Sequence, residues 1–200
     1  MGGRPSLAMP IHGWTLAEGG PVGGILAVFA GSALLAASAW VQVPMWPVPT
    51  TMQTFAVLVI GARYRPWLGA ATVVAYLMEA ALGLPVLAGG RPFGGATSGY
   101  LAGFLLAVVV VSWAVRSGGT RRDWPRLLGA LLLGQASIYV PGLVWLDAVW
   151  LHDLPATLAA GLLPFLPGDA LKLLLAAVVL RLLQRTTKAH HHPGDSHADD

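Results

Sequence analysis

The chain of 200 residues is 56% hydrophobic and 10% charged, and it contains no cysteine. Soluble globular domains carry about 25% charged residues, so this composition excludes a soluble globule. The lack of cysteine excludes disulfides, thiol nucleophiles and thiolate metal sites. The net charge of +3 comes from basic residues in short groups between apolar runs. That arrangement is typical of membrane topology and does not indicate nucleic-acid binding.

Apolar runs bounded by turn residues and charges predict six membrane-spanning helices. Because a span needs about 20 mostly apolar residues, the chain has no room for a second folded domain. The predicted spans lie near residues 22–40, 50–62, 67–82, 99–115, 127–146 and 168–183. We therefore expect one membrane domain over residues 22–185. A polar segment without a cleavable signal peptide (1–21) precedes it, and a disordered polar tail (186–200) follows it.

Prolines mark two segments that we do not count as spans. Segment 43–49 contains Pro44, Pro47 and Pro49, which cannot donate backbone hydrogen bonds. An extended loop folded against the protein is expected there. Segment 151–167 is apolar but is also interrupted by prolines, and it is too short to cross at about 1.5 Å per residue. A partly inserted outer loop is expected there.

Basic residues are distributed unevenly between the two ends of the predicted helices. Six spans place both termini on one side, and the opposite side holds Arg91. The side of the termini holds Arg4, Arg63, Arg65, Arg116, Arg121, Arg122, Arg126, Arg181, Arg185 and Lys188. Because basic residues concentrate on the cytoplasmic side of membrane proteins, this asymmetry predicts cytoplasmic termini.

Two opposite charges fall inside the last predicted span, where a charge costs about 2.5 to 3.5 kcal/mol. Asp169 and Lys172 are three residues apart and so share one helix face. Arg185 lies 13 residues beyond Lys172, or about 20 Å along a helix, which places the pair toward the outer leaflet. An adjacent acceptor and cation suit a solute with amide-like donors and a carboxylate. An internal salt bridge is the alternative.

Glu79 is a third charge in an apolar run, with Tyr76 and Gly83 on the same helix face. Its place late in the third span predicts the same depth as Asp169 and Lys172. A binding role and a structural role as a protonated carboxyl explain it equally well, because a buried carboxyl readily becomes neutral.

Three further polar residues are candidates for the same outer pocket. Arg91 follows two glycines, which allow close backbone approach, so its guanidinium is suited to a carboxylate. Contact of Arg91 with lipid phosphate is the alternative. Gln135 and Tyr139 share a face just before an expected helix break at Pro141 and Gly142. For Gln135, a role in helix packing is an equally good explanation.

Two weaker patterns lie near the ends of the chain. Small residues at four-residue spacing in the first span predict close contact with another helix or a partner subunit. They are Gly23, Ala27 and Gly31, with Ala33 and Ala37 offset. The C-terminal tail contains His190, His191, His192 and His197. Weak metal binding there is the alternative to disorder, and no metal or cofactor is expected elsewhere.

Several longer motifs lie between residues 47 and 177. They are PVPTTMQTFAVLVIG (47–61), AYLMEAALGLPVLAGG (75–90), GATSGYLAGF (95–104) and LPFLPGDALKLLLAA (163–177). In addition, Tyr139, Gly142 and Trp145 follow a Y-x-x-G-x-x-W spacing. Together these motifs resemble the BioY family, the biotin-binding S components of energy-coupling factor (ECF) vitamin transporters. The charged pair is the G-D-x-x-K element of that family, whereas Ala96 and Ser98 replace its usual Pro and Gly.

The resemblance implies an all-α bundle of six transmembrane helices in the cytoplasmic membrane of a prokaryote, with outer loops closing over bound biotin. It also implies a transmembrane T component and two ATPase subunits as partners, and it leaves a homo-oligomer open. Lys172 and Arg91 would neutralise the carboxylate of biotin, and Asp169 would accept hydrogen bonds from its ureido N–H groups. Tyr100, Tyr139 and Trp145 would offer apolar or stacking surface.

Other function classes find little support in the sequence. No histidine falls within a predicted span, and the chain lacks G-x-S-x-G and H-E-x-x-H, so an enzyme is not expected. It also lacks G-x-x-x-x-G-K-[ST], so ATP hydrolysis would have to come from partners. The alternative function is a proton-coupled secondary transporter of a small carboxylate or another vitamin that uses Glu79. The corresponding broken helices in two halves are not evident.

Overall fold

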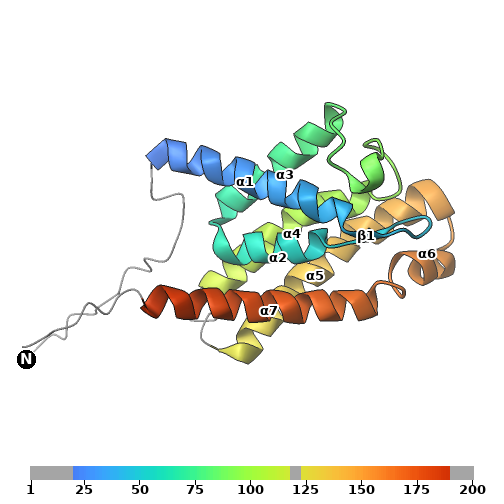
Figure 1. Ribbon diagram of the computed structural model, residues 1–200. Helices are drawn as coiled ribbons and strands as arrows, with labels where there is room; N and C mark the ends of the chain where they lie inside the picture. Colours follow the sequence, from blue (N-terminus) through green and yellow to red (C-terminus); the bar gives the residue numbers. More distant parts are fainter. Residues whose placement is uncertain (1–19, 118–122, 190–200) are drawn as a thin grey trace, which may run out of the picture.

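The computed structural model describes residues 20–117 and 123–189, with side chains up to residue 183. This part of the chain is a helical bundle with one short hairpin (Figure 1). A 3₁₀ turn (η2) and a π-helical turn (η3) interrupt the order of α-helices. The elements are α1 Gly20–Trp40, β1 Gln42–Val43, β2 Thr50–Thr51, α2 Gln53–Arg63, α3 Pro66–Ala81, η2 Ala88–Gly90, α4 Ser98–Arg116, α5 Trp124–Leu146, η3 Asp147–Leu151, α6 Leu154–Gly161 and α7 Leu166–Ala189.

Three of the described helices are long and apolar enough to cross a membrane. They are α1, α4 and the continuous helix Trp124–Leu151, and the pair α6 and α7, bent by 46°, makes a fourth if it counts as one span. Each of the six predicted runs contains a helix, but α2 has 11 residues and α3 has 16. These lengths correspond to about 16 and 24 Å, less than the hydrocarbon thickness of about 30 Å. Helix length alone therefore supports three or four spans.

Three of the expected boundaries are wrong. The run 50–62 begins as strand β2 and becomes helical at Gln53, because the backbone before that residue pairs with β1. α5 passes through Pro141 without the expected break, since a proline inside a bundle removes one hydrogen bond that neighbouring groups can replace. α7 continues to its last residue, Ala189, so residues 186–189 are helical. The four histidines of the tail lie outside the described residues.

Loops and short elements cover one end of the bundle. The proline-rich segment 43–49 lies in an antiparallel hairpin in which Gln42 is opposite Thr51. The expected outer loop 151–167 contains helix α6 and a turn. Figure 1 shows the hairpin and α6 at the end opposite to that where α1 begins and α7 ends. The first residues of α1 and the last residues of α7 therefore lie at the end of the bundle that the hairpin and α6 do not cover.

The contact between α4 and α5 is close because glycines line it. A Cβ atom on Gly103 would lie 2.6 Å from the carbonyl oxygen of Ile138. A Cβ atom on Gly142 would lie 2.4 Å from the ring of Tyr100. Both distances are shorter than van der Waals contact, so a larger residue would push the helices or the ring away. The glycines thereby fix where Tyr100 sits.

The small residues of α1 meet another helix of the same chain. Ala27 and Gly31 are buried, and a Cβ atom on Gly31 would lie 2.5 Å from Cγ2 of Thr72 in α3. The other three small residues are half-buried or exposed: Gly23, Ala33 and Ala37. The buried two therefore serve packing within the chain, and the exposed ones are the part of the pattern that a partner subunit can reach.

Candidate ligand-binding site

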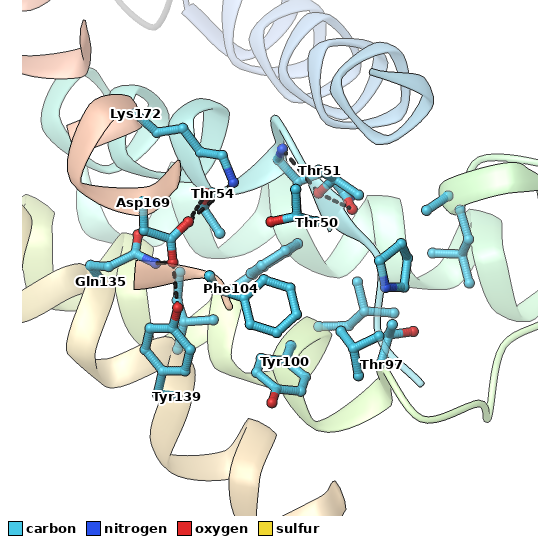
Figure 2. A pocket seen from close by; sticks show the side chains of 18 of the residues that line it. Thr50, Thr51, Thr54, Thr97, Tyr100, Phe104, Gln135, Tyr139, Asp169 and Lys172 are labelled. Carbon is cyan, nitrogen blue, oxygen red and sulfur yellow. Dashed lines mark hydrogen bonds and ion pairs between the residues drawn. The ribbon is translucent and has the colours of Figure 1, made fainter. Parts of the chain in front are cut away.

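A cavity lies among the hairpin, the loop after α3, and helices α2, α4, α5 and α7 (Figure 2). It contains about 660 Å³ of empty space, including the part open to solvent. A mostly apolar wall with a few convergent polar groups is the usual form of a small-molecule site. The apolar wall includes Val48, Leu87, Tyr100, Leu101, Phe104, Ile138 and Phe165, and the polar groups come from Thr50, Thr51, Gln53, Thr54, Arg91, Thr97, Gln135, Tyr139, Asp169 and Lys172.

The charged pair predicted from the sequence forms one wall of this cavity. Asp169 and Lys172 are 6% and 7% exposed, and Lys172 Nζ lies 3.1 Å from Asp169 Oδ1. The opposite charges neutralise each other, which makes burial of the pair tolerable. An ammonium group has three N–H donors. Within the described part of the chain Asp169 is the one hydrogen-bond partner of Lys172, so further N–H donors are available to a ligand.

Asp169 is also held from the opposite side. Gln135 Nε2 donates to Asp169 Oδ2 over 2.6 Å, and the Tyr139 hydroxyl donates to the same oxygen. Because a carboxylate only accepts, the amide nitrogen of Gln135 has to face it. The hydroxyl of Thr54 lies 3.5 Å from Oδ1, beyond the usual length of an O–H···O hydrogen bond. Oδ2 is therefore saturated, whereas Oδ1 has Lys172 as its one close donor among the described residues and can accept from a ligand (Figure 2).

Thr50 adds an uncommitted hydroxyl near the charged pair. Its Oγ1 is buried and has no hydrogen-bond partner among the described residues. Figure 2 shows this hydroxyl pointing across the cavity toward Asp169 and Lys172. The neighbouring Thr51 hydroxyl instead accepts from the backbone N–H of Gln53 over 3.2 Å. A ligand group with both N–H donors and a carbonyl acceptor would satisfy the open positions at this end of the cavity.

Aromatic rings form a rigid apolar surface beside the polar end. The rings of Tyr100 and Tyr139 meet edge to face with centroids 6.2 Å apart, and the centroid of Phe165 lies 6.5 Å from that of Tyr100. The Tyr100 hydroxyl donates to the carbonyl oxygen of Gly161 over 2.8 Å, which ties α4 to α6. Because their polar groups are already bonded, these side chains offer a ligand mainly apolar contact.

Arg91 reaches the cavity from the loop between η2 and α4. Its side chain lines the cavity but is exposed, so it lies where the cavity opens. Hydrogen bonds anchor the loop, because Gln53 Nε2 donates to the Tyr76 hydroxyl over 2.7 Å and that hydroxyl donates to the Val86 carbonyl oxygen over 3.0 Å. Arg91 at the mouth has no ion-pair partner among the described residues, and the pair at the buried end is neutral overall, which together suit a ligand whose anionic group stays near solvent.

Two predicted site residues lie elsewhere. The Ser32 hydroxyl donates to Glu79 Oε2 over 2.6 Å and joins α1 to α3, and Glu79 does not line the cavity. Of the two roles left open for Glu79, this contact fits the structural one, because depth along a helix does not specify which way the residue faces. The indole N–H of Trp145 donates to the carbonyl oxygen of Gly95 over 3.1 Å. Trp145 therefore supports the loop before α4 and does not line the cavity.

The sequence prediction missed several lining residues. Thr50, Thr54 and Gln53 all lie in the motif at 47–61, and a run of hydroxyl and amide groups before a short apolar helix was a usable signal. Phe104 in α4 and Phe165 in the turn before α7 gave no such signal, since an apolar residue in an apolar segment does not show which way it faces.

Comparison with known proteins shows which family the chain resembles. Residues 13–189 match the model of the BioY family. The biotin transporter BioY of Thermotoga maritima is 32% identical over 162 residues, which are 77% of this chain and 91% of that protein. The biotin transporter BioY of Rhodobacter capsulatus is 35% identical over 154 residues, which are 68% of this chain and 78% of that protein.

A solved structure shows the same fold. The crystal structure of the S-component for biotin from an ECF-type ABC transporter matches with a TM-score of 0.76 and 26% sequence identity. The match covers 86% of this chain and 95% of that chain. These relatives are transporters and not enzymes. The match to the family model includes all described residues, and the chain is an integral membrane protein that belongs to the BioY family.

Proposed function

We propose that this chain binds biotin in the cavity and acts as the S component of an ECF-type transporter that takes up biotin. The relatives named above support this function. The observation that carries it is the buried Asp169–Lys172 pair, which is neutral overall and keeps donor and acceptor positions toward an apolar cavity. The ureido group of biotin offers two N–H donors and one carbonyl acceptor on a compact ring, which matches those positions.

We infer that the two polar ends of biotin lie at the two ends of the cavity. At the buried end, Asp169 Oδ1 would accept from a ureido N–H group, and Lys172 and Thr50 would donate to the ureido oxygen. The carboxylate would lie at the mouth with Arg91, which is exposed and has no competing carboxylate partner among the described residues. The expectation that Lys172 also binds the carboxylate is less suitable, because Asp169 already neutralises it.

A titration of variants against two ligands tests this arrangement. We would measure the calorimetric affinity of the detergent-solubilised protein for biotin and for biotin methyl ester, which lacks the carboxylate charge. Arg91→Ala should weaken biotin about tenfold and the ester little, because one charge-assisted hydrogen bond is worth about 1.5 kcal/mol or more. Lys172→Ala and Asp169→Ala should weaken both ligands by similar factors. Arg65→Ala is the control, since Arg65 is exposed and does not line the cavity.

Two outcomes would contradict the proposal at different levels. Wild-type affinity for biotin weaker than micromolar would reject biotin as the ligand. Tight biotin binding with equal losses for both ligands in Arg91→Ala would keep the ligand but reject the assignment of the carboxylate to Arg91.

The membrane arrangement and the partners belong to the same proposal. The six predicted runs each contain a helix, and α1 begins at the end where α7 ends (Figure 1). This supports six spans with cytoplasmic termini in the cytoplasmic membrane. A transmembrane T component and two ATPase subunits would supply the energy, and the exposed Ala33 and Ala37 of α1 are a candidate contact for the T component. Labelling of single cysteines placed at positions 65 and 93 from either side of the membrane tests the orientation.

A further inference from the structure

A second hollow lies between the first turn of α5 and the later turns of α7. It contains about 1290 Å³ of empty space, including the part open to solvent, and it shares no residue with the cavity described above. Figure 1 shows the start of α5 beside the C-terminal half of α7, at the end away from the hairpin. The residues that line the hollow are Asp123, Trp124, Pro125, Arg126, Val178, Arg181 and Leu182.

Arg181 is the central cation of this hollow. Its guanidinium carbon lies 5.2 Å from the centroid of the Trp124 ring, so the ring holds it in place. Its Nε is buried and has no hydrogen-bond partner among the described residues, and no carboxylate in that part of the chain forms an ion pair with it. Buried donors in native structures are nearly always bonded. An acceptor from outside this part of the chain is therefore needed.

The other charges of the hollow leave it positive. Arg126 Nη1 lies 3.1 Å from Asp123 Oδ2, and these side chains are 66% and 52% exposed. The carboxylate thus offsets Arg126 at the solvent edge, whereas Arg181 lies deeper and has no compensating carboxylate within the described ranges. A guanidinium presents a planar set of N–H donors that fits phosphate oxygens.

An apolar stripe leads away from Arg181 along α7. Its residues are Leu171, Leu174, Leu175, Val178 and Leu182, which are 41% to 69% exposed. Their spacing of three, four, seven and eleven residues from the first places them on one helix face, over about 16 Å. Trp124 of α5 lines the hollow together with Leu182, the last residue of this stripe. Tryptophan is typical of the interface between lipid and water. The hollow therefore joins a phosphate-binding cation to a surface that suits an acyl chain.

We propose that this hollow binds the headgroup of an anionic phospholipid, with a phosphate oxygen accepting from Arg181 and an acyl chain on the α7 stripe. Basic pockets between transmembrane helices bind anionic lipids in this way. A free phosphate ion would match Arg181 but would leave the apolar stripe unused. The proposal concerns a site apart from the biotin cavity and does not depend on the ligand of that cavity.

Native mass spectrometry of the full chain in detergent tests the proposal. With equimolar phosphatidylglycerol and phosphatidylcholine, we expect adducts enriched in phosphatidylglycerol, because the choline cation of the other lipid repels Arg181. Arg181→Gln should weaken phosphatidylglycerol binding about tenfold, since it removes a charged hydrogen bond. Arg65→Gln is the matched control, because Arg65 is a cation at the N-terminus of α3 that does not line the hollow, and it should keep the wild-type preference.

Three results would overturn the proposal. They are equal binding of the two lipids by the wild-type protein, an unchanged preference in Arg181→Gln, and competition by inorganic phosphate that removes the lipid at equal concentration. The last result would indicate a site for a free anion. If Arg181→Gln does not fold, Trp124→Leu takes its place, because it removes the ring that positions the guanidinium. Unchanged lipid binding in that variant would equally reject the site.

Discussion

Asp169→Asn and Lys172→Met should destabilise the protein to different extents, although both break the same ion pair. After Asp169→Asn, Lys172 is a 7% exposed cation without its one partner in the described structure. Leaving a buried charge uncompensated costs about 3 to 5 kcal/mol. After Lys172→Met, the carboxylate keeps its hydrogen bonds from Gln135 and Tyr139 and its place in the first turn of α7. The helix dipole favours a negative charge there, so we expect a loss of about 1 to 2 kcal/mol.

The double variant distinguishes the effect of an uncompensated buried charge from a general loss of stability. Asp169→Asn combined with Lys172→Met leaves no buried charge, so it should be more stable than Asp169→Asn alone. We would measure the free energy of unfolding in mixed micelles by titration with a denaturing detergent, in the absence of biotin. Arg65→Gln, which changes an exposed cation, should stay within about 0.5 kcal/mol of wild type.

Two outcomes would refute this reasoning. A loss in Lys172→Met as large as that in Asp169→Asn would show that the amide and the hydroxyl do not stabilise the isolated carboxylate. Additive losses in the double variant would show that the two side chains do not interact energetically, since directly contacting residues are expected to couple by about 0.5 kcal/mol or more.

Three further predictions test the helix contact, the carboxylate support and the proton-coupled alternative. Gly103→Ala should lower the free energy of unfolding by about 1 to 3 kcal/mol, because its Cβ would lie 2.6 Å from a backbone carbonyl oxygen of α5. Gly129→Ala, with no atom within 4 Å, should be neutral or stabilising in the same assay. Tyr139→Phe should weaken biotin less than Asp169→Ala does, because it removes one of several donors; an equal loss in calorimetry would contradict this. Glu79→Gln should leave biotin uptake within about twofold of wild type, because Glu79 lies outside the cavity. Uptake by this variant should also be insensitive to a protonophore. Abolished uptake would favour proton coupling.

Local spacing made the charged pair predictable, whereas longer-range packing hid other parts of the site. Asp169 and Lys172 lie three residues apart on one helix, so their contact follows from helix geometry alone. The position of Glu79 also follows from its helix, but the direction of its side chain depends on how α3 packs on α1. The position of each charge along its helix predicted its depth in the membrane but did not predict which side chain of another helix it contacts.

The same limit explains the errors in the fold. Each predicted apolar run contains a helix, because apolar composition over such a length requires one in a membrane. The hairpin before α2 and the uninterrupted course of α5 through Pro141 depend on contacts between segments that are distant in sequence. The low helix propensity of proline describes the preference of an isolated chain, and packing against neighbouring helices can override that preference.

The buried pair is better explained by a ligand than by stability. Replacing a buried ion pair with apolar residues is often neutral or stabilising by about 1 to 4 kcal/mol, so packing alone does not favour its presence. A purely structural pair would also be expected to satisfy its donors and acceptors internally. Here Lys172 keeps N–H donors and Asp169 keeps an acceptor position, and the nearby Thr50 hydroxyl has no partner within the described structure. The free-energy cost of removing water from the pair arises when the protein folds. A ligand that completes these hydrogen bonds therefore does not add that cost on binding, so the site is preorganised.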